Sequence, residues 1–490
     1  MVEFLPDCGR VSVCTAAPGH ERGTSVPAIE IMSPVKDMSL ATAAPTVPMR
    51  LARGTFVVLL TLSIVLPTML QSVKIALLAV VVGGAFLARE TWSAQSSPKQ
   101  TFLDLWAVLF ATAGLVWSIG GLVQGNPGST AMLTVHAAYP LLAVLLWRIA
   151  RPGDFTKLSG YLVLAAALVL ATQALFIASF FGIDDGAFFR LFLGALDEDT
   201  AVVDAGEDYL LFTLPSVSSL LFMAPWLAVY SVLTRKNRAM HVVLFFVAVG
   251  ALMLAGRRAS LLALATGLCV AFFAAQAIRR RDTASSGMGK RLVLLLFALG
   301  ISVSLAFATG LLNSDLLVER AASIFDFSGN ESNIVRRLQF DALVDGIIDH
   351  PLLGNGLGAA ASYTRSDEQP WAYELSYVAL AFQFGLLGFS FFMAGGAFLL
   401  WKLARLVRSE QLEEPERLSA VCFLAGLVAL LVSNATNPYL AKFDYMWVLF
   451  IPLGMIRLYS FESRPTPLQS SHGHRQVSPT ASGNARIETN

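Results

Sequence analysis

The stretch SYVALAFQFGLLGFSFFMAGGAFLLW, residues 376–401, runs for 26 residues without a charged side chain. About 20 apolar residues in a helix are enough to cross the hydrocarbon core of a membrane. Similar segments recur along the 490-residue chain, which is 55% hydrophobic and 14% charged, with a mean hydropathy of +0.63. They do not alternate residue by residue, as the strands of a membrane β-barrel do. The sequence therefore predicts an all-α polytopic membrane protein.

About 12 segments are apolar and long enough to be predicted as transmembrane helices. They are residues 54–71, 74–88, 102–123, 131–148, 159–181, 210–233, 240–255, 259–278, 292–312, 376–401, 418–435 and 441–458. The longest segment between them is 313–373, between the ninth and tenth helices.

The loops between these segments alternate in charge. Lys and Arg gather in every second loop, namely 89–101, 148–158, 234–240, 279–291 and 402–417. Of the other set, 124–130 has no basic residue, and 182–209 has a single Arg190 against eight acids. Because short loops rich in Lys and Arg stay in the cytoplasm, we expect both chain ends there and the acidic loops outside. The net charge of +1 gives no further information on partners.

The chain is expected to divide into five parts. These are a disordered cytoplasmic tail (1–50), helices 1 to 9 (51–312), an external loop domain (313–373), helices 10 to 12 (374–460) and a second disordered cytoplasmic tail (461–490). An alternative for the first part is that translation begins at Met49, because basic residues directly before a span are typical of a natural start.

Two adjacent arginines stand out in the stretch LMLAGRRASLLALATG, residues 252–267. Arg257 and Arg258 fall in a very short loop that the charge pattern places outside. Arginine is disfavoured on that side, so a plain polar turn is the less favoured of the two interpretations of the pair.

The external segment 313–373 is too long for a simple connection. It contains SNIVRRLQFDALVDGIIDHPLLGNGLGAA, which predicts a helix that ends at Pro351 and a glycine-rich turn. The helix carries an apolar stripe that would lie on the membrane surface or pack on the spans beneath it. The stripe consists of Leu338, Ala342, Leu343, Ile347 and Ile348.

The glycines of HPLLGNGLGA, residues 350–359, do not form a nucleotide-binding motif. A phosphate-binding loop requires Gly-Lys-Ser/Thr after a strand, and a dinucleotide fingerprint requires a βαβ unit; neither is present. Gly354, Gly356 and Gly358 are expected to allow tight turns and close backbone approach. Asp349 and His350, just before Pro351, are expected to cap the helix.

These motifs together resemble the O-antigen ligase and polysaccharide polymerase superfamily of bacterial inner membranes. NIVRRLQFDALVDGIIDHPLLGNGLG and, about 20 residues later, YELSYVALAFQFGLLG resemble the family's large external loop and the span that follows it. In the family, an Arg lies some 15 residues before a Pro-Leu-Leu-Gly-x-Gly-x-Gly turn. AGRRASLLAL is similar to an arginine element that opens an earlier span. By motif, the resemblance covers roughly residues 250–400.

The resemblance implies an inverting glycosyltransferase with its active site on the periplasmic face of the inner membrane. Its donor would be a glycan on a polyprenyl diphosphate carrier, and its acceptor a glycan hydroxyl. Neither a nucleotide sugar, a metal nor another cofactor is expected. Membrane lipids would be further partners, and no nucleic acid is expected as a partner.

Several arginines are candidates to bind the diphosphate, whose negative charge grows as the glycosidic bond breaks. Guanidinium groups bind phosphate with two parallel hydrogen bonds. The candidates are Arg257, Arg258, Arg336 and Arg337. The distance to Pro351 matches the family pattern better for Arg336, which we expect to be catalytic, and either arginine of the earlier pair would contact the donor.

Glu374 occupies the position at which the ligase branch of the family has a histidine, counted back from the Gly-x-x-Gly of Gly385 and Gly388. Glu374 would act as a general base or orient the acceptor sugar. The missing histidine favours a polymerase over the ligase that moves finished glycan to lipid A-core or another acceptor. The residues expected to shape turns are Pro351, Gly354, Gly356, Gly358, Gly385 and Gly388.

A transporter and a lipid-linked glycan flippase are the alternatives of another class. A twelve-span transporter typically has two similar halves and a long loop between the sixth and seventh spans. That loop, TRKNRAM, is short in this chain, and the long loop comes after the ninth span. A flippase would also need arginines for a diphosphate, but in a cavity open to both sides.

Overall fold

Helix α15 (Ser376–Val407) contains the uncharged stretch and, with an interruption at Gly385, covers more residues than any other helix in the described part of the chain. The fold is that of a computed structural model. It describes residues 46–87, 98–151, 153–182, 202–206, 209–234, 237–255, 258–279, 290–301 except 292, 296 and 299, 331–365, 367–409 and 412–459. Seven of the described helices are long and apolar enough to cross a membrane, and four shorter apolar helices accompany them. The chain is therefore a multi-pass, mainly helical membrane protein.

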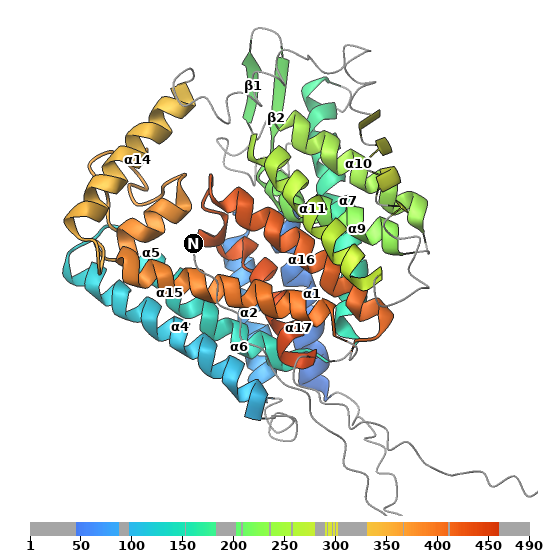
Figure 1. Cartoon of the computed structure of the whole chain (residues 1–490), viewed down its shortest axis with the longest axis horizontal. Coiled ribbons are helices and arrows are strands. Elements are labelled where there is room, and N and C mark those ends of the chain that lie inside the picture. Colours follow the sequence, from blue (N-terminus) through green and yellow to red (C-terminus); the bar gives the residue numbers. More distant parts are fainter. Residues whose placement is uncertain are drawn as a thin grey trace, which may run out of the picture. The chain divides into compact units, whose positions relative to one another are not determined.

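The remaining helices follow in chain order (Figure 1). They are α1 (Val47–Val65), α2 (Gln71–Leu87), α4 (Pro98–Val123), α5 (Ser129–Leu133), α6 (Tyr139–Ile149), α7 (Asp154–Phe180), α9 (Leu220–Leu233), α10 (Arg238–Leu254), α11 (Arg258–Arg279), α14 (Glu331–Asp349), α16 (Glu414–Asn434) and α17 (Trp447–Tyr459). A π-helix (Thr134–Ala138) joins α5 to α6 without a break in direction. Of the predicted span 292–312, only residues up to 301 are described, so the count of 12 spans stays a prediction.

The span predicted from residue 210 starts later than expected. Strand β1 (Val202–Gly206) pairs in antiparallel register with β2 (Tyr209–Thr213), so that Val202 lies opposite Thr213. The helical segment starts only at Pro215, in a 3-10 turn that continues into α9. Residues 209–213 are apolar but belong to a hairpin, because a short apolar run does not by itself distinguish strand from helix.

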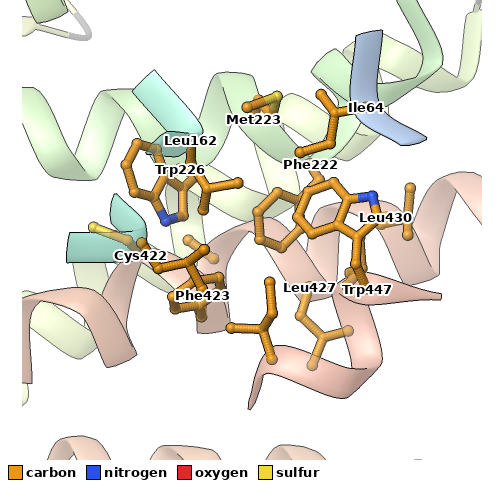
Figure 2. Packing of buried hydrophobic residues seen from close by; sticks show 14 of the residues in the cluster. Ile64, Leu162, Phe222, Met223, Trp226, Cys422, Phe423, Leu427, Leu430 and Trp447 are labelled. Atoms are coloured by element: carbon orange, nitrogen blue, oxygen red, sulfur yellow. The ribbon is translucent and has the colours of Figure 1, made fainter. Parts of the chain in front are cut away.

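Helices α9 and α16 form the centre of the bundle. Of their apolar windows, 89% and 72% of the residues are buried, whereas the value for α4 is 33%. Figure 2 shows how Phe222 of α9 packs between rings from other helices, with its ring centroid 4.8 Å from that of Trp447 and 6.0 Å from that of Phe423. Gly426 lets the two backbones approach closely, since a Cβ there would lie 2.8 Å from the carbonyl oxygen of Phe222. Small residues at such crossings are typical of membrane helix pairs.

Ion pairs join helix ends that the charge pattern assigns to the cytoplasm. Asp104 of α4 accepts hydrogen bonds from Arg148 of α6 at 2.9 Å and from Arg457 of α17 at 3.0 Å. Arg53 of α1 pairs with Asp154 of α7 at 3.0 Å. These contacts connect ends that the predicted topology puts on one side of the membrane, which is consistent with that topology.

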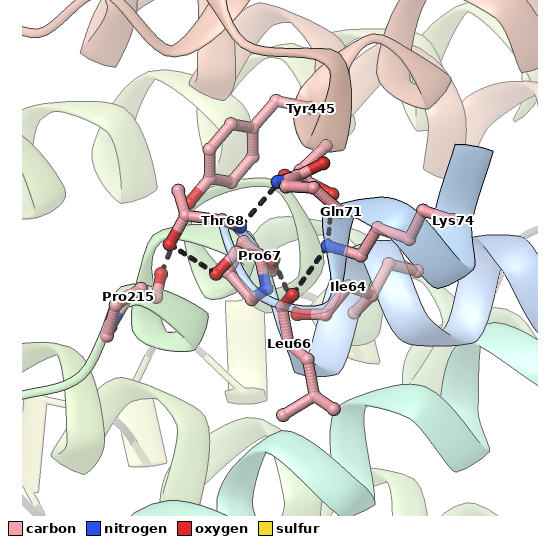
Figure 3. A network of polar contacts seen from close by, with 10 residues as sticks. Ile64, Leu66, Pro67, Thr68, Gln71, Lys74, Pro215 and Tyr445 are labelled. Carbon is pink, nitrogen blue, oxygen red and sulfur yellow. Dashed lines mark hydrogen bonds and ion pairs between the residues drawn. The ribbon is translucent and has the colours of Figure 1, made fainter. Parts of the chain in front are cut away.

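Another ion pair lies at the opposite ends of these helices and is almost fully buried. Lys74 Nζ of α2 lies 2.6 Å from Asp444 Oδ1 in the turn before α17, and their side chains are 1% and 3% exposed. Lys74 also donates to the Leu66 carbonyl oxygen at 2.6 Å, and the backbone N–H of Thr68 donates to Asp444 Oδ2 at 2.8 Å. Figure 3 shows Lys74, Leu66 and Thr68 in this network. The ion pair and the bond from Thr68 connect α2 and the segment between α1 and α2 to the segment between α16 and α17.

Removing one partner of this pair is expected to cost more stability than removing both. Lys74→Met or Asp444→Asn alone leaves a buried group without its counter-charge, which typically costs about 3–5 kcal/mol. The double variant Lys74→Met with Asp444→Leu should unfold at a higher temperature than either single variant. Thermal unfolding in detergent measures this, and a double variant no more stable than the more stable single variant would show that the uncompensated charge does not determine the loss of stability.

Candidate functional site

Helix α14 packs on the first part of α15 through a small core of its own (Figure 1). Leu343 is fully buried there with Tyr373 and Phe382. Of the predicted apolar stripe, Ala342, Leu343 and Ile347 belong to the buried side or border it, whereas Leu338 and Ile348 are exposed. The stripe therefore packs on α15 along only part of its length.

The glycine-rich turn after α14 has a left-handed backbone at three positions. The φ angles of Gly354, Gly356 and Gly358 are 72°, 78° and 75°. A side chain at Gly358 would also lie 2.1 Å from the carbonyl carbon of Gly128, in the turn between α4 and α5. Only glycine combines this conformation with this approach at low cost.

Helix α15 is interrupted at Gly385, where φ is 66° and ψ is 177°. The N–H groups of Leu386 and Leu387, just after the break, donate to the carbonyl oxygens of Pro351 (2.8 Å) and Leu352 (3.2 Å). Before the break, the Phe382 carbonyl oxygen accepts the N–H of Asn355 at 2.9 Å. Irregular backbone is tolerated at membrane depth only if its polar groups are paired. The glycine-rich turn thus supplies the hydrogen bonds that α15 loses.

The other side of the glycine-rich turn is held by α4 and the turn that follows it. Trp117 Nε1 donates to the carbonyl oxygen of Leu353 at 2.9 Å, and Asn126 Nδ2 donates to that of Asn355 at 2.8 Å. A Cβ at Gly121 would lie 2.2 Å from the carbonyl oxygen of Leu357. The turn is wedged between α4 and the interrupted α15.

Glu374 lies two residues before the start of α15. Each of its two carboxylate oxygens accepts a hydrogen bond from an arginine. Arg336 Nε of α14 donates to Glu374 Oε2 at 2.7 Å, and Arg365 Nη1 donates to Oε1. The Glu374 side chain is 10% exposed, that of Arg336 27% and that of Arg365 55%. The backbone N–H of Glu374 donates to Oε1 of the fully buried Gln339, one turn along α14 from Arg336.

Tyr373, next to Glu374, is buried and fixes the loop that carries Arg365. Its hydroxyl oxygen accepts a hydrogen bond from the backbone N–H of Ala361. Burial raises the pKa of the Tyr373 phenol, and the bond from Ala361 opposes that shift. The phenol is therefore neutral at physiological pH.

The segment from α10 to the middle of α15 matches a known protein family. Residues 243–393 match the family model described as O-antigen ligase. The resemblance to the O-antigen ligase and polymerase superfamily is confirmed. The matched segment contains α14, the glycine-rich turn, Glu374 and the interruption of α15. No curated protein matches the chain significantly.

The structure brings together two of the residues that the family resemblance singled out, Arg336 and Glu374. Arg337, the next residue on α14, is exposed and makes no ion pair among the described residues. Arg257 lies outside the described residues; Arg258 opens α11, but its side chain also lies outside them. Whether the earlier arginine pair faces Glu374 stays a prediction. Asp349 and His350 are exposed at the end of α14.

Arg365 was not singled out from the sequence. Arg365 lies in the irregular stretch SYTRSDEQPW, nine residues before Glu374. Neither a helical nor a strand periodicity would predict that these two residues are close in space. A lone arginine in an acidic, exposed loop has no pattern that distinguishes it from a surface charge. Only the fold of the loop brings it to the carboxylate.

Substitutions at two neighbouring glycines of α4 test how the glycine-rich turn packs between α4 and α15. Gly121→Ala places a Cβ against the Leu357 carbonyl oxygen, whereas a Cβ at Gly120 would meet nothing within 4 Å. We expect Gly121→Ala to destabilise the protein by about 1–3 kcal/mol and to speed tryptic cleavage at Arg365. Gly120→Ala should be neutral or stabilising by about 0.5–1 kcal/mol. Equal cleavage rates and equal unfolding temperatures for the two variants would contradict the packing described here.

Proposed function

We propose that this protein is a polysaccharide polymerase of the bacterial inner membrane, producing O-antigen or exopolysaccharide. It transfers glycan from a polyprenyl diphosphate carrier to an acceptor sugar hydroxyl on the periplasmic face. The observation that carries the proposal is the 2.7 Å pair of Arg336 and Glu374 within the family-matched segment. The match supports glycan transfer of the ligase or polymerase type, and the pair supplies a carboxylate and a cation for it.

The proposed reaction is a single displacement. The acceptor oxygen attacks the anomeric carbon and its proton passes to Glu374 as general base. The bond from that carbon to the diphosphate oxygen breaks, and the electron pair leaves with the lipid diphosphate. Arg336 uses one N–H for Glu374, and the guanidinium has five, so donors remain for the leaving group. Arg257, Arg258 and Arg337 are proposed as further contacts to the diphosphate.

The predicted topology would put this site on the periplasmic face, with both chain ends in the cytoplasm. Contacts between loops expected outside support this arrangement. The turn at 124–128 binds the glycine-rich turn through Asn126 and through the N–H of Gly128, which donates to the Gly358 carbonyl oxygen at 3.0 Å. The ion pairs of Asp104 and Arg53 lie at the opposite helix ends, where the expected cytoplasmic loops begin.

The choice of polymerase over ligase rests on Glu374 in place of the histidine of the ligase branch. Deleting the gene separates the two functions. A strain without the polymerase should retain single repeat units on their normal acceptor, whereas loss of a ligase leaves long chains on the lipid carrier. Electrophoresis of the surface polysaccharide and of the lipid-linked pool provides the measurement. Full-length polymer on its normal acceptor in the deletion strain would rule out both functions.

Glu374→Gln should abolish polymer formation because the amide cannot take the acceptor's proton. The loss of a general base typically lowers the rate by about 10²- to 10⁴-fold. Asp341→Asn is the matched control, since Asp341 is an exposed acid on α14. Complementation of the deletion strain with equal amounts of each membrane-inserted variant provides the test. Wild-type chain lengths with Glu374→Gln would exclude Glu374 as the base.

A further inference from the structure

Both carboxylate oxygens of Glu374 accept a hydrogen bond from an arginine in the structure. These bonds affect how Glu374 can act as a general base. Oε2 accepts from Arg336 and Oε1 from Arg365. A carboxylate oxygen engaged with a guanidinium must release that bond before the same lone pair can accept a proton from a sugar hydroxyl. A carboxylate has about four acceptor positions, and arginines take two of them here, one on each oxygen. Under the proposed function, on which this inference rests, this is the arrangement of the base before the donor binds.

The two arginines are held very differently. Arg336 projects from a regular helix, is 27% exposed and approaches Asn333 Oδ1, one turn earlier, at 3.5 Å from Nη1. Arg365 projects from an irregular loop, and its side chain is 55% exposed. Arg365 is thus the partner that an incoming anion reaches first and that moves with the least disturbance.

The energies favour exchange at Arg365. Water screens the Arg365 end of the ion pair, because that side chain is 55% exposed whereas the Glu374 side chain is 10% exposed, and the long arginine side chain loses freedom when it is held in the pair. A diphosphate offers more charge than one carboxylate, and its oxygens accept two parallel bonds from a guanidinium. Separating the more buried Arg336 from Glu374 costs more, since a desolvated carboxylate would lose its remaining partner.

From this geometry we infer that Arg365 binds the donor diphosphate and that its transfer from Glu374 to the donor frees the base. Oε1 of Glu374 then accepts the proton of the acceptor hydroxyl, while Arg336 stays on Oε2. The diphosphate departs with the electron pair of the broken bond and Arg365 beside it. Glu374 gives its proton to water when the site empties, and Arg365 returns to Oε1. The donor must therefore bind before the acceptor can be activated.

Farnesyl diphosphate, a soluble short-chain prenyl diphosphate, tests the inference on the full-length protein in detergent. Arg365→Ala should weaken its binding about tenfold, as expected for a lost charge-assisted contact. Glu374→Gln should strengthen binding about two- to fivefold, because Arg365 no longer has a carboxylate to leave. In the double variant this gain should vanish, since the two changes act on one pair. Arg365→Lys should restore part of the affinity.

The controls are Gln369→Ala, an exposed residue in the loop of Arg365, and Asp341→Asn, which removes an acid from α14. Both should bind like the wild type. If Arg365 only supported the fold, Glu374→Gln would bind farnesyl diphosphate equally or more weakly, and that result would overturn the inference. Unchanged binding by Arg365→Ala would do the same even if Glu374→Gln failed to fold. If the wild type bound farnesyl diphosphate no better than farnesol, the proposed function itself would fail.

Discussion

The interruption of α15 at Gly385 is the constraint on which the site depends. A continuous helix would pair the N–H of Leu386 with the Phe382 carbonyl, but here Pro351 and Asn355 take those two places. The glycine-rich turn is thereby part of the hydrogen bonding of a membrane helix, although it belongs to a segment that the charge pattern predicts to be external. Because α4 holds its other side through Trp117 and Asn126, the start of α15 and the end of α14 are fixed relative to the bundle. These contacts therefore determine the position of Glu374 relative to Arg336.

The site places one carboxylate between cations that its proposed substrate also needs. A glycan transfer with a diphosphate leaving group requires a base for the acceptor and positive charge for the carrier. In the resting protein the carboxylate offsets part of the positive charge of the two arginines, which limits the cost of holding these charges near the membrane. The family match at residues 243–393 covers this whole arrangement, from α10 to the middle of α15.

The membrane class and most of the helices could be predicted from the sequence, because uncharged runs such as 376–401 have few alternatives to a spanning helix. The hairpin at 202–213 could not, since its second strand is as apolar as the span it precedes. Arg336 and Glu374 were found through family motifs, and their pairing needed the fold. Successive helix positions differ by about 100° in direction, which separates Arg336 from the exposed Arg337. Lys74 and Arg365 carry no local pattern, since their partners are set by tertiary structure.

The pairing of Lys74 with Asp444 also bears on the order in which the protein is made. The two residues are 370 positions apart, so the lysine enters the membrane long before its counter-charge exists. Until the last turn is synthesised, the first hairpin carries an uncompensated cation that has to remain at the interface or near lipid phosphate. The burial of Lys74 in its final environment thus depends on a turn that is made near the end of synthesis, and a chain that ends before Asp444 lacks the counter-charge of this lysine.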